Sequence, residues 1–271
     1  MLTLIRKIIF HDVLEWIEEN LYINPDINLI AKISGYSKRH IQNIFKNNTG
    51  VSVGHYVKER RLSQAALLIR LTKKSIFNIA MDLNYSSQQT FHRAFLNKFG
   101  YTPLSFRKLS YFDVSKLEPK FNADHFSYNI KVKDNIYFSL EASPIEYYEN
   151  ILSERYKKAN DIKLKHILDN IEKSDSVYFA STYSILPSLK NEVKVTSYIG
   201  TWQEPEANLT IPKGKYAYIE FSGTWNEYIF FSRHFYLLSE FKRRDGYDVE
   251  IFSLNPNKHG QYNVKIYIPI I

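Results

Sequence analysis

Side chains that can read DNA bases recur in two stretches of this sequence, residues 30–45 and 79–95. Arg, Asn and Gln carry pairs of hydrogen-bonding groups that match base edges in the major groove of DNA. In both stretches they lie opposite apolar residues that recur at helical spacing. For one stretch alone, a merely solvated polar face would be an equal alternative. The candidate base-reading residues are Arg39, Gln42, Asn43, Gln88, Gln89, Thr90 and Arg93.

The two stretches are copies of one unit, and a repeat defines what a chain is built from. Three pairs align at an offset of 49 residues: Ala31/Ala80, Tyr36/Tyr85 and Ser37/Ser86. Two later pairs align at an offset of 50: Phe45/Phe95 and Gly50/Gly100. The change of offset predicts one residue inserted in the second-helix region of the unit.

Each copy has the features of a helix-turn-helix, in which a second helix enters the major groove. Gly35 and Asn84 stand where the turn needs a left-handed backbone, which these residue types tolerate. Ser37 and Ser86 follow as predicted N-caps of the second helix. The matched turn chemistry favours DNA reading over a solvated face for the pair.

A helical pattern over residues 51–71 separates the copies. An uninterrupted helix of about 17 residues would be roughly 25 Å long, and successive major grooves are about 34 Å apart. We therefore expect one monomer to read two neighbouring grooves on a site that need not be palindromic. Basic residues near this helix are candidates for contact with DNA phosphates. The alternative is that some of them are ordinary surface charges. The candidate phosphate contacts are Ser37, Lys38, Lys46, Arg60, Arg61, Ser86 and Lys98.

The excess of positive over negative charge is confined to the repeat-bearing part of the chain. Residues 1–112 hold 16 Lys and Arg against 7 Asp and Glu, whereas the remainder holds 20 against 21. Phosphate neutralisation is the main source of sequence-independent DNA affinity.

The sequence has no Cys, its eight His show no metal-ligand spacing, and no apolar run approaches twenty residues. We expect no cofactor, no metal, no membrane span and a cytoplasmic location.

The composition changes after the second copy, which predicts two domains. We expect an all-α domain over residues 1–110, a linker over 111–124 and an α+β domain over 125–271. Period-two patterns predict strands at 128–133, 136–140, 176–184, 192–200, 215–222, 249–254 and 262–270. Residues 145–171 and 228–242 have helical patterns, the first as one long helix or two shorter ones. An antiparallel sheet with helices, built as a duplicated βαββ unit, is one arrangement that fits.

Alternation on two strands of this second domain predicts a ligand site. Tyr218 and Glu220 share one face of their strand, and Lys265 and Tyr267 share one face of the last strand. If the opposite, aliphatic faces pack on the helices, these side chains line an aromatic-walled cleft. An equal alternative is that the rings are half-buried sheet surface and the charges are solvated. The candidate effector-binding residues are Trp202, Tyr218, Glu220, Trp225, Tyr228, Lys265 and Tyr267.

Residues 5–109 resemble the AraC/XylS class of transcription activators, in the branch of MarA, SoxS and Rob. The resemblance is carried by Ser34-Gly-Tyr-Ser-Lys, Arg60-Arg-Leu-Ser and Ser87-Gln-Gln-Thr-Phe-His-Arg-Ala-Phe. The domain order, with a GyrI-like effector-binding domain second, resembles that of Rob. The resemblance implies a stress or multidrug-response activator that binds an asymmetric promoter element as a monomer and contacts RNA polymerase.

Three positions depart from the pattern of these relatives. The branch usually has Trp where Arg39 stands and Arg where Asn43 stands, which predicts altered base preference at the first half-site. GyrI-like domains commonly place a Glu for cationic ligands on the last strand, where this chain has Lys265. An anionic or neutral ligand, or none, is therefore at least as well supported as a cationic one.

Three functions remain open at this stage. The leading one is a DNA-binding activator whose second domain senses a small molecule or a partner. In the second, that domain binds no ligand. In the third it is a hydrolase, with Glu220 as a base of raised pKa and Tyr218 and Tyr267 orienting water. Nothing in the spacing demands the third, and we expect no enzyme.

Overall fold

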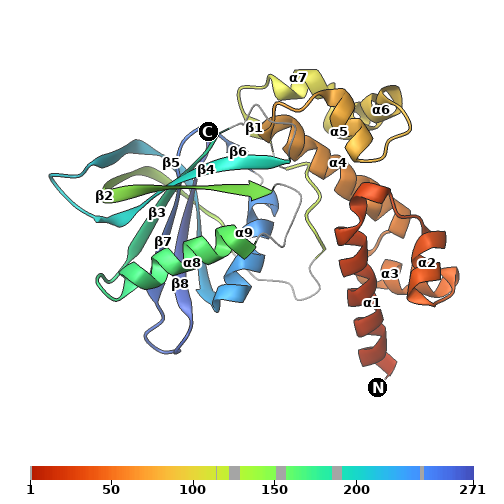
Figure 1. The fold of residues 1–271 in the computed structure, drawn as a ribbon, viewed down its shortest axis with the longest axis horizontal. Helices are drawn as coiled ribbons and strands as arrows, with labels where there is room; N and C mark the ends of the chain where they lie inside the picture. Colours follow the sequence, from red (N-terminus) through yellow and green to blue (C-terminus); the bar gives the residue numbers. More distant parts are fainter. Residues whose placement is uncertain (1, 114, 122–128, 151–156, 185–190, 239–240) are drawn as a thin grey trace. The chain divides into compact units, whose positions relative to one another are not determined.

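The chain divides into two compact units in a computed structural model, which describes residues 2–113, 115–121, 129–150, 157–184, 191–238 and 241–271 (Figure 1). The first unit comprises residues 1–70, 74–108 and 116–125, and the second comprises 71–73, 109–115 and 126–271. The predicted linker is therefore shared, since residues 111–115 group with the second unit and those from 116 onward with the first.

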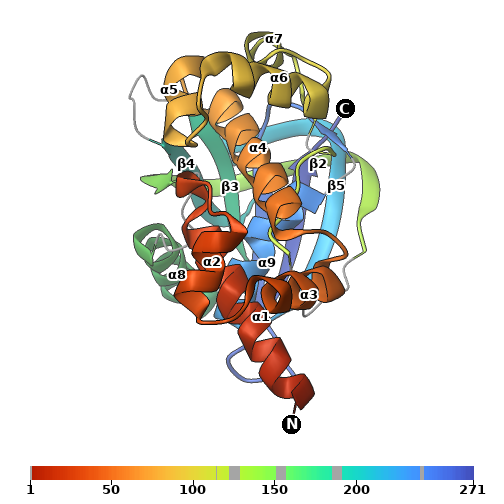
Figure 2. The same ribbon diagram turned by 90° about the vertical axis from the view of Figure 1, so that its right-hand side faces the viewer.

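The first unit is helical, and a long helix, α4, runs between two helix-turn-helix pairs (Figure 2). The pairs are α2 with α3, and α5 with α6. The elements of this unit are α1 (Leu2–Glu19), η1 (Leu21–Ile23), α2 (Ile27–Ser34), α3 (Lys38–Thr49), α4 (Val53–Leu71), α5 (Ile76–Asp82), α6 (Gln88–Phe99) and α7 (Pro103–Arg107).

Turn and cap residues explain where these helices end and begin. Gly35 and Asn84 have left-handed backbones, with φ of 73° and 52°. The Ser37 hydroxyl accepts a hydrogen bond from His40 N at 3.2 Å, which caps α3 as predicted. The predicted cap Ser86 is wrong by one residue, because Ser87 accepts from Thr90 N at 3.1 Å and caps α6. The inserted residue of the second copy therefore lies in the turn, and α3 and α6 have the same length of 12 residues.

Apolar side chains pack around both helix pairs. Phe10, Ile41, Phe45 and Tyr56 belong to a buried cluster that joins α1, α2, α3 and the start of α4. On the other side, rings contact one another at centroid distances of 4.5 to 5.6 Å, in the set Phe91, Phe95, Phe99 and Phe106. The 19 residues of α4 correspond to about 28 Å of helix. This long helix is a rigid spacer because its middle is buried on several sides.

The second unit consists of strand, helix, strand, strand, twice over. The six long strands close into a barrel in the order β2-β4-β3-β7-β8-β5. This order matches the duplicated βαββ arrangement expected from the sequence. The repeats are β2 (Lys131–Asn150), α8 (Lys157–Ile171), β3 (Val177–Ser184) and β4 (Glu192–Trp202), then β5 (Leu209–Gly223), α9 (Trp225–Leu238), β7 (Asp248–Leu254) and β8 (Tyr262–Pro269). A short antiparallel pair, β1 (Phe112–Asp113) with β6 (Lys242–Arg243), completes the unit.

The predicted helix over residues 145–171 is wrong in its first part, because residues 145–150 continue strand β2. Ile145 and Tyr147 point inward while Glu146 and Tyr148 are exposed, which is the period-two burial of a strand. Residues 131–140 of β2 pair with β5 and residues 140–150 pair with β4. One strand with two partners closes the ring.

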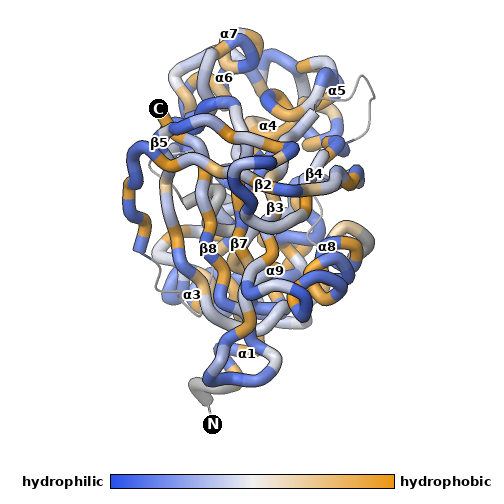
Figure 3. The backbone as a smooth tube through the Cα atoms, turned by 90° about the vertical axis from the view of Figure 1, so that its left-hand side faces the viewer, coloured by the Kyte–Doolittle hydropathy of each residue, from blue (hydrophilic) through white to orange (hydrophobic). Residues whose placement is uncertain are grey.

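Each face of this ring has its own apolar cluster. The face covered by α8 and α9 carries the aliphatic residues Ala217, Ile219, Val264 and Ile266, as predicted. The opposite face carries a second cluster rich in tyrosine. Hydrophobic and hydrophilic segments accordingly alternate along α8 and the strands (Figure 3). Among the described residues, no helix is long and apolar enough to cross a membrane.

Candidate functional site

Helices α3 and α6 present equivalent polar faces to solvent. On α3, Arg39 and Asn43 are exposed one turn apart, and on α6 Gln89 and Arg93 are exposed at the same spacing. The offset of 50 residues between the helices makes Asn43 the counterpart of Arg93. Of the remaining candidates Thr90 is exposed, whereas Gln42 and Gln88 are partly covered. All seven predicted base-reading residues thus lie on the two second helices.

Leu96 belongs to the same exposed stretch of α6 and was missed by the sequence reasoning. Its side chain is 42% exposed, in the position that Lys46 occupies on α3. An exposed leucine on a polar face is a candidate for contact with a thymine methyl group. The helical pattern alone could have found it, since Leu96 falls outside the apolar stripe of Phe91, Phe95 and Phe99.

Four of the predicted phosphate contacts are exposed at or near α3 and α6. Ser37 caps α3, Lys38 begins it and Lys46 lies in its last turn, whereas Ser86 lies in the turn before α6. Lys38 and Lys46 carry full charges that can neutralise phosphates. These positions remain predictions.

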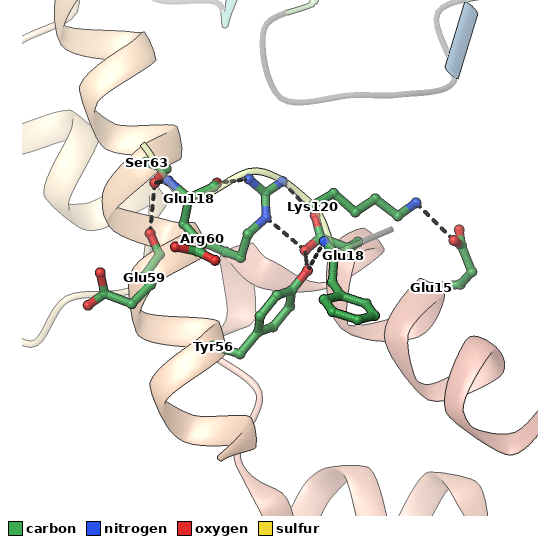
Figure 4. Close-up of polar contacts among 9 residues, drawn as sticks. Glu15, Glu18, Tyr56, Glu59, Arg60, Ser63, Glu118 and Lys120 are labelled. Carbon is green, nitrogen blue, oxygen red and sulfur yellow. Dashed lines mark hydrogen bonds and ion pairs between the residues drawn. The ribbon is translucent and has the colours of Figure 1, made fainter. Parts of the chain in front are cut away.

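Arg60 is a correction, because its guanidinium faces the protein interior and pairs with a carboxylate (Figure 4). Its Nε and a terminal nitrogen donate to the two carboxylate oxygens of Glu18 at 2.8 and 2.7 Å, and its other terminal nitrogen donates to Glu118 O. The Tyr56 hydroxyl donates to the same carboxylate at 2.6 Å. The two charged side chains are only 8% and 6% exposed, so Arg60 is not available to DNA.

The ionisation of Glu18 reflects this pairing. Burial alone would raise the pKa of Glu18, but the charge and hydrogen bonds of Arg60 and the hydroxyl of Tyr56 outweigh burial and lower the pKa of Glu18. Burial, and next the charge of Glu18, raise the pKa of Tyr56 well above its ordinary value, so its hydroxyl stays protonated and donates. The cluster also includes the segment after α7, since Glu118 N donates to Ser63 Oγ at 2.7 Å and Lys120 pairs with Glu15 at 2.8 Å (Figure 4).

Arg61 is a second correction and joins the two halves of the first unit. It is 5% exposed and donates to Leu83 O, at the end of α5, and to Asn24 Oδ1, just after η1. Its guanidinium also lies 4.5 Å from the centre of the Tyr85 ring. The side-chain amide of Asn84 reaches back to Ile23 O at 2.9 Å. Arg61 therefore joins the end of α5 to the segment after η1, and its buried guanidinium does not fit the predicted phosphate contact.

Lys98 is a third correction. Its ammonium pairs with Glu59 at 2.6 Å and its side chain is 9% exposed. Arg60, Arg61 and Lys98 all point into the protein because each has an acceptor from a distant part of the chain. Part of the excess of basic side chains in this unit therefore pairs with acceptors inside the protein.

The predicted effector residues do not form one cleft. Tyr218 and Tyr267 are 3% and 8% exposed, and their rings contact each other at 4.9 Å. Phe138 contacts Tyr267 at 5.2 Å, so aromatic rings fill this side of the sheet. The predicted cleft is absent because the sheet closes into a ring. Tyrosine side chains that were expected to face outward therefore contact one another across it.

The charged members of that set lie in solvent. Glu220 and Lys265 are exposed and occupy directly paired positions on β5 and β8. The Tyr218 hydroxyl donates to Glu220, and this bond is the first cause that lowers the pKa of Glu220. A general base of raised pKa, as the hydrolase alternative required, is therefore contradicted at Glu220. Trp202 is 41% exposed and its ring contacts Tyr137 and Tyr178.

Trp225 and Tyr228 lie on α9 and pack onto the helix-covered face of the sheet. Their rings stack at 5.2 Å, and Tyr228 is 2% exposed. Tyr228 donates a hydrogen bond to Glu250 of β7, which also pairs with Lys163 of α8. Burial, and next the charge and hydrogen bond of Glu250, raise the pKa of Tyr228 well above its ordinary value.

Glu250 and Lys163 were missed by the sequence reasoning. Glu250 is 4% exposed, on a strand position that alternation with Phe252 marks as inward. A carboxylate at such a position was a signal that could have been used, since buried charges need partners. Among the described residues of this unit the buried carboxylates are thus Glu250 and Asp248, whereas the position of Lys265 is exposed.

Comparisons with known proteins match both units. Residues 30–109 match a helix-turn-helix domain family, and residues 146–271 match the GyrI-like small molecule binding domain. The regulatory protein SoxS of Escherichia coli is 44% identical over 99 residues, which cover 36% of this chain and 92% of SoxS. The chain belongs to the AraC-type family of helix-turn-helix regulators.

Two further AraC-type relatives extend into the second unit. The F1 operon positive regulatory protein of Yersinia pestis is 28% identical over 264 residues, which cover 92% of this chain and 84% of that protein. The transcriptional regulator Rob of Salmonella typhimurium is 36% identical over 137 residues, which cover 51% of this chain and 46% of Rob. The match thus spans about half the length of some curated relatives. The predicted family, its SoxS and Rob branch and its GyrI-like second domain are confirmed.

Proposed function

We propose that this AraC-type regulator binds DNA as a monomer, with α3 and α6 in two successive major grooves. The observation that supports this most is the equivalence of α3 and α6, two helices of equal length with exposed polar faces on either side of one buried helix. Arg61 bonds to both halves, so the reading helices have a fixed relation before DNA is bound. A fixed relation lowers the entropy cost of binding two grooves at once.

The base contacts are assigned to the exposed positions of each helix. Arg39 and Asn43 read bases from α3, and Gln89 and Arg93 read bases from α6. Gln42, Gln88 and Thr90 lie at the margins of these faces, and Thr90 also takes part in the cap of α6. Arginine pairs with guanine and asparagine with adenine in bidentate geometry.

Replacing Asn43 by Arg is expected to change the preferred base at the first half-site from adenine to guanine. The expected discrimination is about 1–3 kcal/mol, the range of one bidentate contact. Binding-site selection from a random DNA library measures it. Asn47→Arg, which adds the same charge at another exposed position of α3, is the matched control and should leave the preferred base unchanged. An unmodified protein that already selects guanine at that base pair would contradict the role of Asn43.

We also propose that the regulator is an activator that contacts RNA polymerase and responds to a small molecule. The support for activation is the relative named as a positive regulatory protein, and the support for an effector is the GyrI-like match. The effector site is assigned to the helix-covered face, around Glu250, Tyr228 and Trp225. A thermal-shift screen of the full chain tests this, because a ligand of the folded state raises the melting temperature. Hits that also bind a Glu250→Gln variant equally well would contradict the assignment.

A further inference from the structure

A lysine ammonium lies inside the second unit, in surroundings that resemble a binding site for a free amine. Lys163 of α8 pairs with Glu250 of β7, and its Nζ donates to the Tyr228 hydroxyl of α9 at 3.0 Å. Side chains from three separate elements thus meet at one charged group. The carboxylate provides the counter-charge and the hydroxyl provides a directed acceptor.

Three aromatic rings surround the same nitrogen. The Lys163 Nζ lies 5.4 Å from the ring centre of Phe179, 5.3 Å from that of Tyr228 and 5.5 Å from that of Phe252. A cation within about 6 Å of a ring centre is attracted by the ring face, and several such rings form the cages that recognise ammonium ligands. The rings also contact one another, with centres 5.6 Å apart for Phe179–Phe252 and 5.0 Å for Tyr228–Phe252. The wall is therefore continuous.

Lys163 is the member of this cluster nearest to solvent. Its side chain is 15% exposed, against 5% for Glu250, and it is attached to α8 by a flexible four-carbon stem. With Lys163 in place the site has no net charge, whereas without it a buried carboxylate faces an aromatic wall.

We propose that Lys163 is a tethered ligand that occupies an ammonium site of this unit and excludes free organic cations from it. A free primary amine binds there only when Lys163 is displaced or removed. Lys163 thus sets the ligand specificity of the face on which the proposed effector site lies. The inference rests on the proposed effector site. It is tested without DNA, so it can fail while the proposed DNA-binding function holds, and the reverse.

The test compares the full chain with its Lys163→Met variant, using n-butylammonium chloride as a copy of the lysine side chain. The melting temperature of Lys163→Met should rise with n-butylammonium, with an apparent affinity at least tenfold above that of the unmodified protein. Sodium chloride and n-butanol, which supply the ions and the neutral chain, should have no such effect. Lys165→Met, at an exposed position of the same helix, should behave as the unmodified protein. A Lys163→Met/Glu250→Gln double variant should lose the response.

Equal responses of the unmodified protein and Lys163→Met would overturn the proposal, as would a full response of the double variant. If Lys163→Met does not fold, rescue by n-butylammonium supports the proposal and failure of rescue counts against it. A second measurement needs no variant. Under limited acetylation of the unmodified chain, peptide masses should show Lys165 modified well before Lys163, and equal modification would contradict the buried pairing.

Discussion

Replacing Arg60 by Ala is expected to destabilise the first unit by about 3–5 kcal/mol, the cost of removing one partner from a buried ion pair. The loss is large because Glu18 stays buried while its two guanidinium hydrogen bonds and its counter-charge disappear. Chemical denaturation followed by helical circular dichroism measures the free energy of unfolding. Lys58→Ala, on an exposed position of the same helix, is the control and should change it by no more than about 0.5 kcal/mol.

The same variant separates a structural role from a phosphate contact. Loss of one phosphate contact reduces the salt dependence of DNA binding by about one unit of slope, and Arg60→Ala should leave this slope unchanged at temperatures where the variant is folded.

Acid, like the substitution, should lower the free energy of unfolding of the first unit. Since the pKa of Glu18 is lowered below 4.5, its contribution to stability is present above that pH and is lost as the pH falls through the folded-state pKa. An unchanged stability in Arg60→Ala, or a reduced salt slope, would restore the phosphate assignment.

Replacing Arg39 and Arg93 together by Ala is expected to weaken binding to the cognate site by about 2–6 kcal/mol. Each arginine that reads a base contributes roughly 1–3 kcal/mol and its loss relaxes specificity at one position. The two effects should add, because the residues lie on different helices and share no partner. Affinities of both single variants and the double variant for cognate and random DNA, at one fixed salt concentration, measure this.

Lys38→Ala is the matched control for the arginine variants. This exposed lysine at the start of α3 is assigned to phosphate, so its loss should weaken cognate and random DNA alike and lower the salt slope by about one. The assignment of base reading would be wrong if the arginine variants lost as much affinity for random DNA as for the cognate site.

The repeat and its turn chemistry made most of the first unit predictable. Gly35 and Asn84 need left-handed backbones, and such local constraints can be seen in one sequence. The roles of Arg60, Arg61 and Lys98 could not be seen in this way. Whether a basic side chain faces water or protein depends on its acceptor, and here the acceptors include Glu18, Asn24, Glu59 and Leu83.

The second unit shows a different limit of the same reasoning. Period-two patterns assigned Tyr218 and Tyr267 to one face, and this is correct. The patterns do not say whether a sheet closes, and closure by β2 turned an expected cleft into an aromatic core. Lys163 and Glu250 are 87 residues apart, so only the fold brings them together.

Footprinting with a defined protein-to-DNA ratio is the most direct test of the central claim. Hydroxyl-radical cleavage of a selected site should show two protected regions one helical turn apart on the same side of the duplex, about 34 Å between centres. Sedimentation of the same complex should give one chain per site. Protection of a single groove, or a requirement for two chains on a palindromic site, would contradict the proposal that one polypeptide reads both grooves.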